Sequence, residues 1–173
     1  MASKVKGLDR LLRQLQALPN SVRAALSDAL QDEAREMAAA VARAAPRRYG
    51  DLQASVGWSP GAPPSVRTNG AFRLSPEDFG ARGDALSKAG LLFTVYAGDD
   101  KAYYARFVEF GTSPAPKGRS RDITGKSRNN LRAHAGTKAQ PFFYPTIRAR
   151  KKAAKSRVVR RLNKAVKAVA ALR

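Results

Sequence analysis

The sequence contains no cysteine and a single histidine. The missing cysteine excludes disulfide bonds, thiolate metal ligands and cysteine nucleophiles together, and it fits a protein made in a reducing cytosol. No apolar stretch approaches the roughly 20 residues that a membrane-spanning helix needs. The N-terminus also lacks the apolar segment of a signal peptide. We therefore expect a protein without disulfides, membrane spans or a secretion signal.

Side chains that could carry catalysis are equally scarce. The histidine, His134, lies in a polar stretch, and its simplest interpretation is a solvated loop residue. One histidine without cysteine provides no metal-ligand spacing, and no phosphate-binding loop of the GxxxxGK[ST] type occurs. The adjacent pairs Glu77-Asp78 and Asp99-Asp100 suit turns, because neighbouring strand residues point to opposite faces. We expect no enzyme activity and no catalytic, cofactor or metal site.

Acidic residues almost disappear from the C-terminal part of the chain. The 33 lysine and arginine residues outnumber the 13 acidic ones, the net charge is +20, and only Asp122 is acidic after Gly111. Such a segment usually meets a polyanion or an acidic protein surface, although a solvated basic face is the simpler alternative. The candidate basic contact surface comprises Arg119, Arg121, Lys126, Arg128, Arg157, Arg160, Arg161 and Lys164.

Helical periodicity marks the two ends of the chain. Leucines at helical spacing predict a short helix over residues 7–18, which Pro19 ends. A second apolar stripe predicts a helix over residues 21–44, ended by Pro46. A third stripe, surrounded by lysine and arginine, predicts a final helix through residues 145–172.

A period of two replaces the helical period in the middle of the chain. Alternating apolar residues predict a half-buried strand over residues 52–58, and an Asn-Gly pair predicts a hairpin within residues 66–74. Residues 75–90 are polar and predict a loop. The apolar run 91–97 predicts a central strand. Residues 103–110 are aromatic and fit either a strand or a short helix.

Residues 113–140 have few apolar side chains and many Pro, Gly, Ser, Lys and Arg residues. They predict a long, flexible basic loop that becomes ordered only in an assembled state, because it buries too little apolar surface alone. Strands flanked by helices favour an α+β fold, with an antiparallel sheet and the N-terminal and C-terminal helices packed on one face. The length of 173 residues suits a single domain, residues 1–173.

Three stretches, in order along the chain, resemble the head–tail joining and tail-completion proteins of long-tailed bacteriophages. APRRYGDLQASV at residues 45–56 is similar to that family's AP-x-x-TG-x-L-x-x-SI segment, with Tyr49 where the family prefers threonine. YYARFVEFGT at residues 103–112 resembles its YA-x-x-vEFGT segment, and QPFFYPTI at residues 140–147 its a-x-PFl-x-PA segment. The family's opening L-x-x-L-x-x-LP matches residues 12–19.

The resemblance implies a small α+β fold related to tail terminators, whose rings, commonly hexameric, cap the tail tube and join it to the head connector. It implies a virion protein of the neck, assembled in the host cytoplasm, without cofactor or membrane. Its partners would be copies of itself, the tail tube protein, connector or stopper proteins, and the double-stranded DNA in the lumen. A basic nucleic-acid-binding protein outside the neck remains the alternative, but it would not explain the order EFGT, then QPF.

The EFGT and QPF stretches contain the candidate subunit or partner interface. Its residues are Glu109, Phe110, Gly111, Thr112, Pro141, Phe142 and Phe143. The Glu109 carboxylate is either solvated at the edge of an element or paired with an arginine of the next subunit. Phe142 and Phe143 fit a core at least as well as a partner contact. We expect Glu109→Lys to leave the subunit folded and to prevent the joining of heads to tails.

Overall fold

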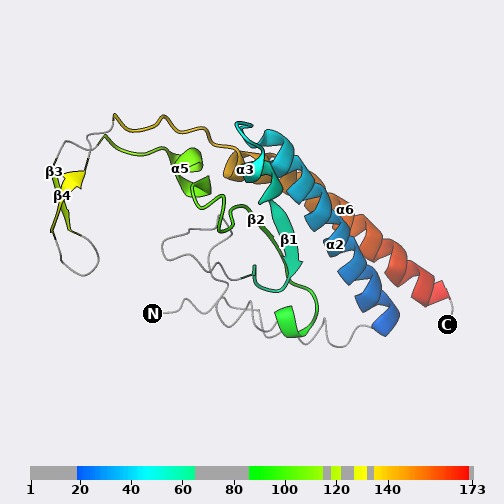
Figure 1. The fold of residues 1–173 in the computed structure, drawn as a ribbon. Coiled ribbons are helices and arrows are strands. Elements are labelled where there is room, and N and C mark those ends of the chain that lie inside the picture. Colours follow the sequence, from blue (N-terminus) through cyan, green and yellow to red (C-terminus); the bar gives the residue numbers. More distant parts are fainter. Residues whose placement is uncertain (1–18, 65–85, 115–117, 122–126, 132–134, 172–173) are drawn as a thin grey trace, which may run out of the picture.

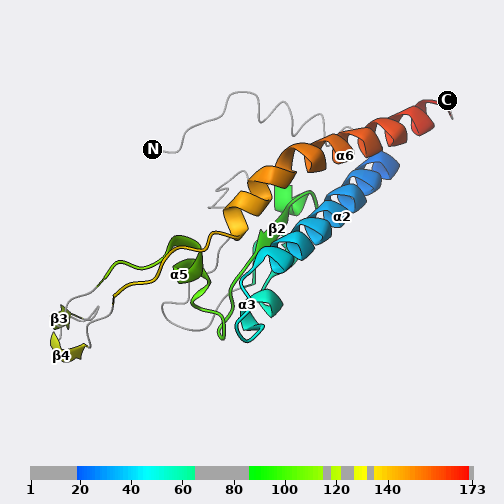
Figure 2. The same cartoon turned by 90° about the horizontal axis from the view of Figure 1, so that it is seen from above.

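Two long helices, α2 (Asn20–Ala44) and α6 (Phe143–Ala171), dominate the computed structural model. They lie side by side over most of their length, as Figures 1 and 2 show from two directions. The helical periodicities over residues 21–44 and 145–172 therefore predicted both helices correctly.

The structure describes residues 19–64, 86–114, 118–121, 127–131 and 135–171. The helix expected over residues 7–18 and the hairpin expected over residues 66–74 lie outside these ranges. Residues 86–88, in the stretch expected to be a loop, form a helical turn. One turn is too short for its periodicity to be recognised in a sequence.

The fold is built around α2, which contacts both α6 and a two-stranded sheet. The buried residues of α2 are small, mainly alanine and valine: Val22, Leu26, Ala29, Ala34, Ala38, Ala40 and Val41. Alanine favours the helix, and its small side chain lets neighbouring elements approach closely. The helix ends where Ala45, next to Pro46, adopts an extended conformation, because a residue before proline disfavours helical geometry.

The sheet consists of β1 (Gly57–Pro60) and β2 (Phe93–Tyr96), which pair antiparallel with Trp58 opposite Val95. The fold is thus α+β, as the order of elements predicted, with α2 packed on the sheet and α6 packed on α2. The apolar run 91–97 suggested a central strand, but β2 pairs only with β1 in the described sheets. Its apolar character has another cause, because α2 covers it.

One helical turn, α3 (Asp51–Ala54), replaces the first half of the strand expected over residues 52–58. The strand itself begins only at Gly57. Gly50 precedes the turn with a φ of +92°, a conformation that glycine adopts readily. Leu52 is buried, as the alternation predicted. Four residues with one buried leucine cannot distinguish a single helical turn from a half-buried strand.

The core lies where the C-terminal half of α2, the sheet and the first turn of α6 meet. Phe143 and Val41 are fully buried in it, and Phe142 almost fully. The short helix α5 (Ala105–Phe110) closes the core from another side with Ala105. The aromatic stretch that fitted either a strand or a helix is therefore helical.

A hairpin occupies part of the stretch predicted to be an unstructured loop over residues 113–140. Strands β3 (Gly118–Arg121) and β4 (Ser127–Leu131) pair antiparallel. We call residues 113–136, which contain this hairpin, the arm. Figures 1 and 2 show the two strands projecting away from the helices and the first sheet. The sequence did not predict these strands because they contain almost no apolar residues, so they lack the alternation of apolar and polar residues that indicates a strand.

Candidate interaction surface

Glu109 on α5 is only 3% exposed, and its carboxylate caps the start of α6. Oε2 accepts hydrogen bonds from the backbone N–H groups of Phe142 (2.7 Å) and Phe143 (2.9 Å), and Oε1 accepts one from Tyr144 (3.1 Å). The first N–H groups of a helix lack partners within it, and a carboxylate also complements the positive end of the helix dipole. Glu109 is therefore neither solvated nor free to pair elsewhere without uncapping α6.

This capping role changes what the Glu109→Lys substitution should do. A lysine would bury a cation among three N–H donors at the positive end of α6, without an acceptor for any of them. We therefore expect the substituted subunit to be destabilised, in contrast to our expectation from the sequence that it would stay folded.

The two ends of the arm are joined by a short antiparallel bridge. The Thr112 N–H donates to the Thr137 carbonyl (3.0 Å), and the Thr137 N–H donates to the Thr112 carbonyl (3.1 Å). A methyl group on Gly111 would lie 2.6 Å from the Thr137 oxygen, and one on Gly136 would lie 2.5 Å from the Thr112 oxygen. Both glycines have positive φ. Only glycine fits this bridge, so the base of the arm is closely packed backbone.

The predicted interface residues separate into a buried and an exposed group. Phe142 and Phe143 are buried with Glu109 and belong to the core. Phe110 is 59% exposed, and Pro141 is exposed as well. The first group holds the junction of α5, the arm and α6 together, whereas the second is accessible to a partner. The partner contacts of this set remain a prediction.

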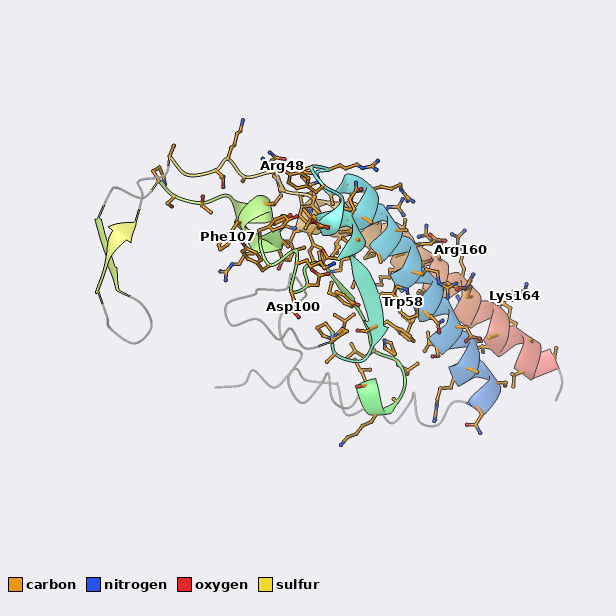
Figure 3. All side chains as sticks on the ribbon, in the orientation of Figure 1. Arg48, Trp58, Asp100, Phe107, Arg160 and Lys164 are labelled. Atoms are coloured by element: carbon orange, nitrogen blue, oxygen red, sulfur yellow. The ribbon has the colours of Figure 1, made fainter. Side chains whose placement is uncertain are left out.

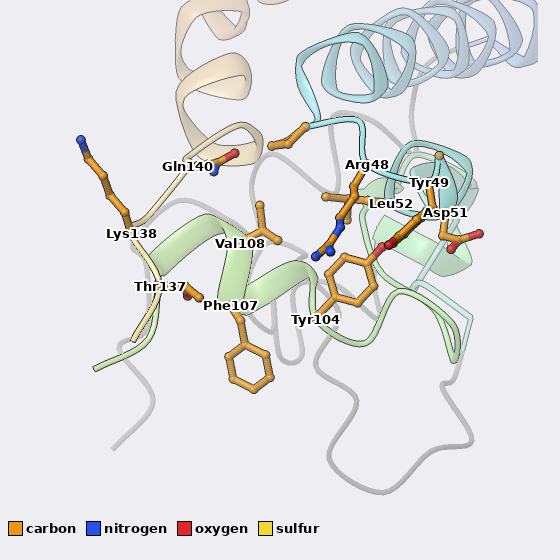
Figure 4. A pocket seen from close by; sticks show the side chains of 12 residues that line it. Arg48, Tyr49, Asp51, Leu52, Tyr104, Phe107, Val108, Thr137, Lys138 and Gln140 are labelled. Carbon is orange, nitrogen blue, oxygen red and sulfur yellow. The ribbon is translucent and has the colours of Figure 1, made fainter. Parts of the chain in front are cut away.

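A pocket of about 470 Å³ lies beside this junction, and Figure 4 shows the side chains around it. Its walls come from residues 46–52, from α5 and from residues 137–140. Tyr49, 77% exposed, and Phe107, 45% exposed, stand at its rim. Exposed aromatic side chains around an apolar hollow are typical of protein interfaces. No sequence pattern predicted this pocket. Tyr49, at the position where the family prefers threonine, was the available signal.

A second hollow of about 360 Å³ adjoins the pocket and shares Asp51 with it. Asp99 and Asp100 line it as well. Asp99 Oδ1 accepts the N–H groups of Lys101 (2.9 Å) and Ala102 (2.7 Å), which fixes the turn that carries these carboxylates. Lys101 lines this second hollow too, and Arg48 and Lys138 line the pocket, so cations and carboxylates are both present around the two hollows.

Tyr104 lines the pocket. Burial raises the pKa of its phenol, and the neighbouring carboxylates of Asp51 and Asp99 raise the pKa further. The phenol thus stays neutral at physiological pH. A neutral hydroxyl in the pocket wall can donate a hydrogen bond to a bound partner.

Ion pairs connect α6 to α2. Arg157 binds Glu33 with two hydrogen bonds, of 2.5 Å from Nε and 2.6 Å from Nη2, and Nη2 also reaches Glu36 at 3.2 Å. Arg161 Nη1 contacts Asp32 Oδ2 at 2.5 Å. The carboxylates raise the pKa of both arginines, and Arg161 lowers the pKa of Asp32. Arg161 pairs with Asp32, whereas Arg157 pairs with Glu33 and Glu36. Residue numbers therefore rise in opposite directions along the two helices, which run antiparallel.

These pairs separate the predicted basic contact surface into two classes. Arg157 and Arg161 pair with acidic residues of α2, although the Arg161 side chain stays 55% exposed, and their contact with a partner remains a prediction. Arg160 and Lys164 are exposed on α6, and Figure 3 labels both. The side chains of the four predicted residues on the arm lie outside the described part: Arg119, Arg121, Lys126 and Arg128. The sequence signal for these ion pairs was the group of acidic residues on α2, Asp32, Glu33 and Glu36, whose spacing matches that of Arg157 and Arg161 on α6.

The described part of the chain holds no group of three or more acidic or histidine side chains that could bind a metal ion. None of its helices is sufficiently long and apolar to cross a membrane. His134 lies outside the described residues.

The comparisons with known proteins bear on the region from the N-terminus to the end of α5. The family described as "Bacteriophage HK97-gp10, putative tail-component" matches residues 9–111, more than half of the 173-residue chain. The match includes α2, the sheet and the helix that carries Glu109. The search of curated proteins finds no match, and neither does the search of solved structures. With α2, the sheet and the capping helix all inside the matched region, this chain belongs to the HK97-gp10-like family of bacteriophage tail components.

Proposed function

We propose that this tail component forms a ring at the head–tail junction, where it completes or terminates the tail tube and joins it to the head connector. The observation that carries the proposal is the contact between the EFGT and QPF stretches. Glu109 of the first caps the helix that opens with Phe142 and Phe143 of the second. Two sequence stretches that resemble tail-completion proteins thus act as one structural unit.

The proposed role depends on fit between surfaces. A ring subunit needs one surface for the preceding copy and another for the following copy. The chain offers a pocket with exposed aromatic residues on its body and a projecting arm. We propose that the 173 residues act as a single domain and that DNA passes through the ring they form.

The exposed cations of α6 suit the partners above and below such a ring. Arg160 and Lys164 are exposed, whereas Arg157 and Arg161 pair with acidic residues of α2. We propose that they meet acidic surfaces of the tail tube or connector proteins. A dense cationic lining of the lumen would hold DNA that must slide through it, which makes the protein surfaces the better partners.

Native mass measurement of the purified chain, combined with electron microscopy of a phage carrying a nonsense mutation in its gene, tests this proposal. We expect a closed oligomer in solution, and separate heads and tails in the mutant lysate. Joined, infectious particles from the mutant would contradict the role. A chain that stays monomeric at high concentration and in the presence of tail tubes would contradict the ring.

The alternative is binding of nucleic acid outside the neck, and the net charge of +20 favours it. Such binding would release counterions and weaken steeply as salt rises. Fluorescence anisotropy with a short DNA duplex over a range of salt concentrations measures this directly. Tight, strongly salt-dependent binding by a monomer that forms no oligomer would favour the alternative over the ring.

A further inference from the structure

The C-terminal half of α6 exposes an apolar stripe. Val159 and Val166 are both 44% exposed. Leu162 and Val169, which alternate with them along the helix, are half-buried. Ala154, the last buried residue of α6, lies on another side of the helix, because the five residues from it to Val159 correspond to about 1.4 turns. The stripe is therefore distinct from the part of α6 that is buried in this chain.

The residues of this stripe repeat at intervals of three and four positions. They occupy the a and d positions of two consecutive heptads, and we call them the α6 seam: Val159, Leu162, Val166 and Val169. Apolar residues at these positions pack into the holes between the side chains of a facing helix. The spacing therefore indicates that the α6 seam fits a second helix.

The cations of this part of α6 all lie away from the seam. In residues 158–171 they occupy heptad positions b, c and f: Arg160, Arg161, Lys164 and Lys167. The e and g positions, which flank the seam, hold only uncharged residues: Val158, Asn163, Ala165 and Ala170. Charges at e and g select the partner of a coiled-coil helix, and like charges there repel each other. Two copies of this basic helix can thus meet at the seam without bringing their cations together.

We propose that the α6 seams of two copies of this chain pack against each other as a short coiled coil. Lys152 and Lys155 occupy the a and d positions of the preceding heptad. In a parallel pair each lysine would face its counterpart, and the like charges would repel. Antiparallel helices keep the lysines of the two copies at opposite ends of the contact. The pair is therefore antiparallel.

This contact goes beyond the proposed ring. Both copies contribute the same surface, so the contact is two-fold and closes on a pair, whereas a ring needs two different surfaces on each subunit. The seam would therefore pair two chains, either free or in different rings. Arg160 and Lys164 stay available to other partners, since they lie at the b and f positions, away from the contact.

The absence of cysteine from the sequence allows a direct test by cross-linking. The single variant Val166→Cys, treated with a short bis-maleimide, should give covalent dimers on a denaturing gel. In the antiparallel pair its two thiols are offset by only about one helical turn along the axis. Two exposed controls on the same helix should stay monomeric: Lys164→Cys at position f, and Lys152→Cys at the end of the contact.

A second substitution removes the apolar character of the seam without entering the core. Val166→Lys places a cation at an exposed a position, so the chain should keep its melting temperature and the dimer should weaken at least about tenfold. Ala171→Lys adds the same cation at an exposed f position and should associate like the wild type. Sedimentation equilibrium at high chain concentrations measures both, because a contact of two heptads is small.

Covalent dimers from Val166→Cys and not from Lys164→Cys, together with the weakened association of Val166→Lys, support the inference. Equal cross-linking of the two thiols, or unchanged association of Val166→Lys, overturns it. Efficient cross-linking of Lys152→Cys overturns the antiparallel arrangement.

Two further results would overturn the seam and not the ring. If a monofunctional maleimide cannot label Val166→Cys in the monomer, another segment of the same chain covers the stripe. If closed oligomers form while Val166→Cys gives no cross-link, the copies meet through other surfaces and the proposed ring still stands. A wild-type chain that remains monomeric at high concentration, even with tail tubes present, contradicts both proposals.

Discussion

Glu109, Gly111 and Gly136 stabilise the fold through contacts with backbone groups. The Glu109 carboxylate receives three N–H donors, and Gly111 and Gly136 allow two backbone segments to approach within hydrogen-bonding distance. Each of these positions requires one residue type for a local physical reason. Their substitution should therefore affect folding before it affects any partner.

Glu109→Ala should reduce the free energy of unfolding by about 2–3 kcal/mol, because it leaves buried N–H donors without an acceptor. Glu109→Gln keeps the volume and one acceptor oxygen, so it should cost about 1 kcal/mol. Urea unfolding followed by far-ultraviolet circular dichroism measures both. Equal stability of wild type and both variants would show that the cap contributes nothing.

Gly136→Ala should destabilise the fold more than Gly50→Ala. Both glycines have positive φ, so each substitution costs about 1 kcal/mol through backbone strain. At Gly136 the new methyl group also meets the Thr112 carbonyl oxygen at 2.5 Å, whereas at Gly50 it meets no atom within 4 Å. Thermal unfolding of the two variants compares them directly. Identical melting temperatures would show that the bridge opens at little cost.

At the scale of elements, the molecule depends on the pairing of α2 with α6. The family match ends at residue 111, before α6 begins, yet Phe142 and Phe143 at the start of α6 complete the core. Further along, ion pairs to Asp32 and Glu33 align α6 with α2. The C-terminal helix is thus an integral part of this fold.

The pair between Asp32 and Arg161 should make stability depend on pH. Arg161 lowers the pKa of Asp32 below its usual value of 3.8. A group with a lowered folded-state pKa stabilises the fold above its unfolded pKa and loses that contribution as the pH falls through the folded pKa. Asp32→Asn should therefore be less stable than wild type near neutral pH and equally stable in strong acid.

Thermal unfolding from about pH 7 to about pH 2 follows this difference. Asp28→Asn, at an exposed position on the same helix, is the matched control and should follow the wild type throughout. A difference for Asp32→Asn that persists in strong acid would exclude the ion pair as its cause.

The arm should be the first segment that a protease cuts in the free subunit. Its lysine and arginine residues suit trypsin, and its hairpin projects away from the other described elements, so it should open easily. In the oligomer the same sites should be protected. Mass spectrometry of a timed trypsin digest identifies the first cuts. An arm that resists trypsin in the monomer would show that it is stable alone.

At the scale of the whole molecule, the net charge of +20 comes from cations with two different roles: some pair with acidic residues of the same chain, and others are available to partners. Arg157 and Arg161 neutralise acidic residues of α2, whereas Arg160 and Lys164 remain exposed on the same helix. A total charge does not distinguish these roles, because charge pairing depends on which helix faces meet.

Replacing Arg160 and Lys164 by glutamine should weaken the joining of heads to tails and leave folding unchanged. The matched pair, Arg157→Gln with Arg161→Gln, should lower the melting temperature because it breaks the ion pairs to α2. Counts of joined particles by electron microscopy, together with thermal unfolding, separate the two effects. Wild-type joining by the Arg160 and Lys164 variant at every salt concentration would identify these cations as a solvated face.

The sequence by itself determined the long helices, the α+β class and the family. Helical spacing over residues 21–44 and 145–172 extends for many turns, so the periodic signal is strong. Short elements carry no such signal. The sequence therefore predicted a strand at residues 52–54, which form a helical turn, and a central strand in the apolar run 91–97, where β2 pairs only with β1 in the described sheets. Only the tertiary structure decided the role of Glu109, because its three donors lie 33 to 35 residues away in the chain.

The same limit applies to the candidate surface. The EFGT and QPF stretches contact each other in the folded chain, but the sequence did not reveal that Phe142 is buried and Phe110 exposed. It also could not assign Arg157 to α2, nor assemble the pocket from three separate segments. Burial and pairing depend on which distant segments the folded chain brings together, and that is set by packing in three dimensions.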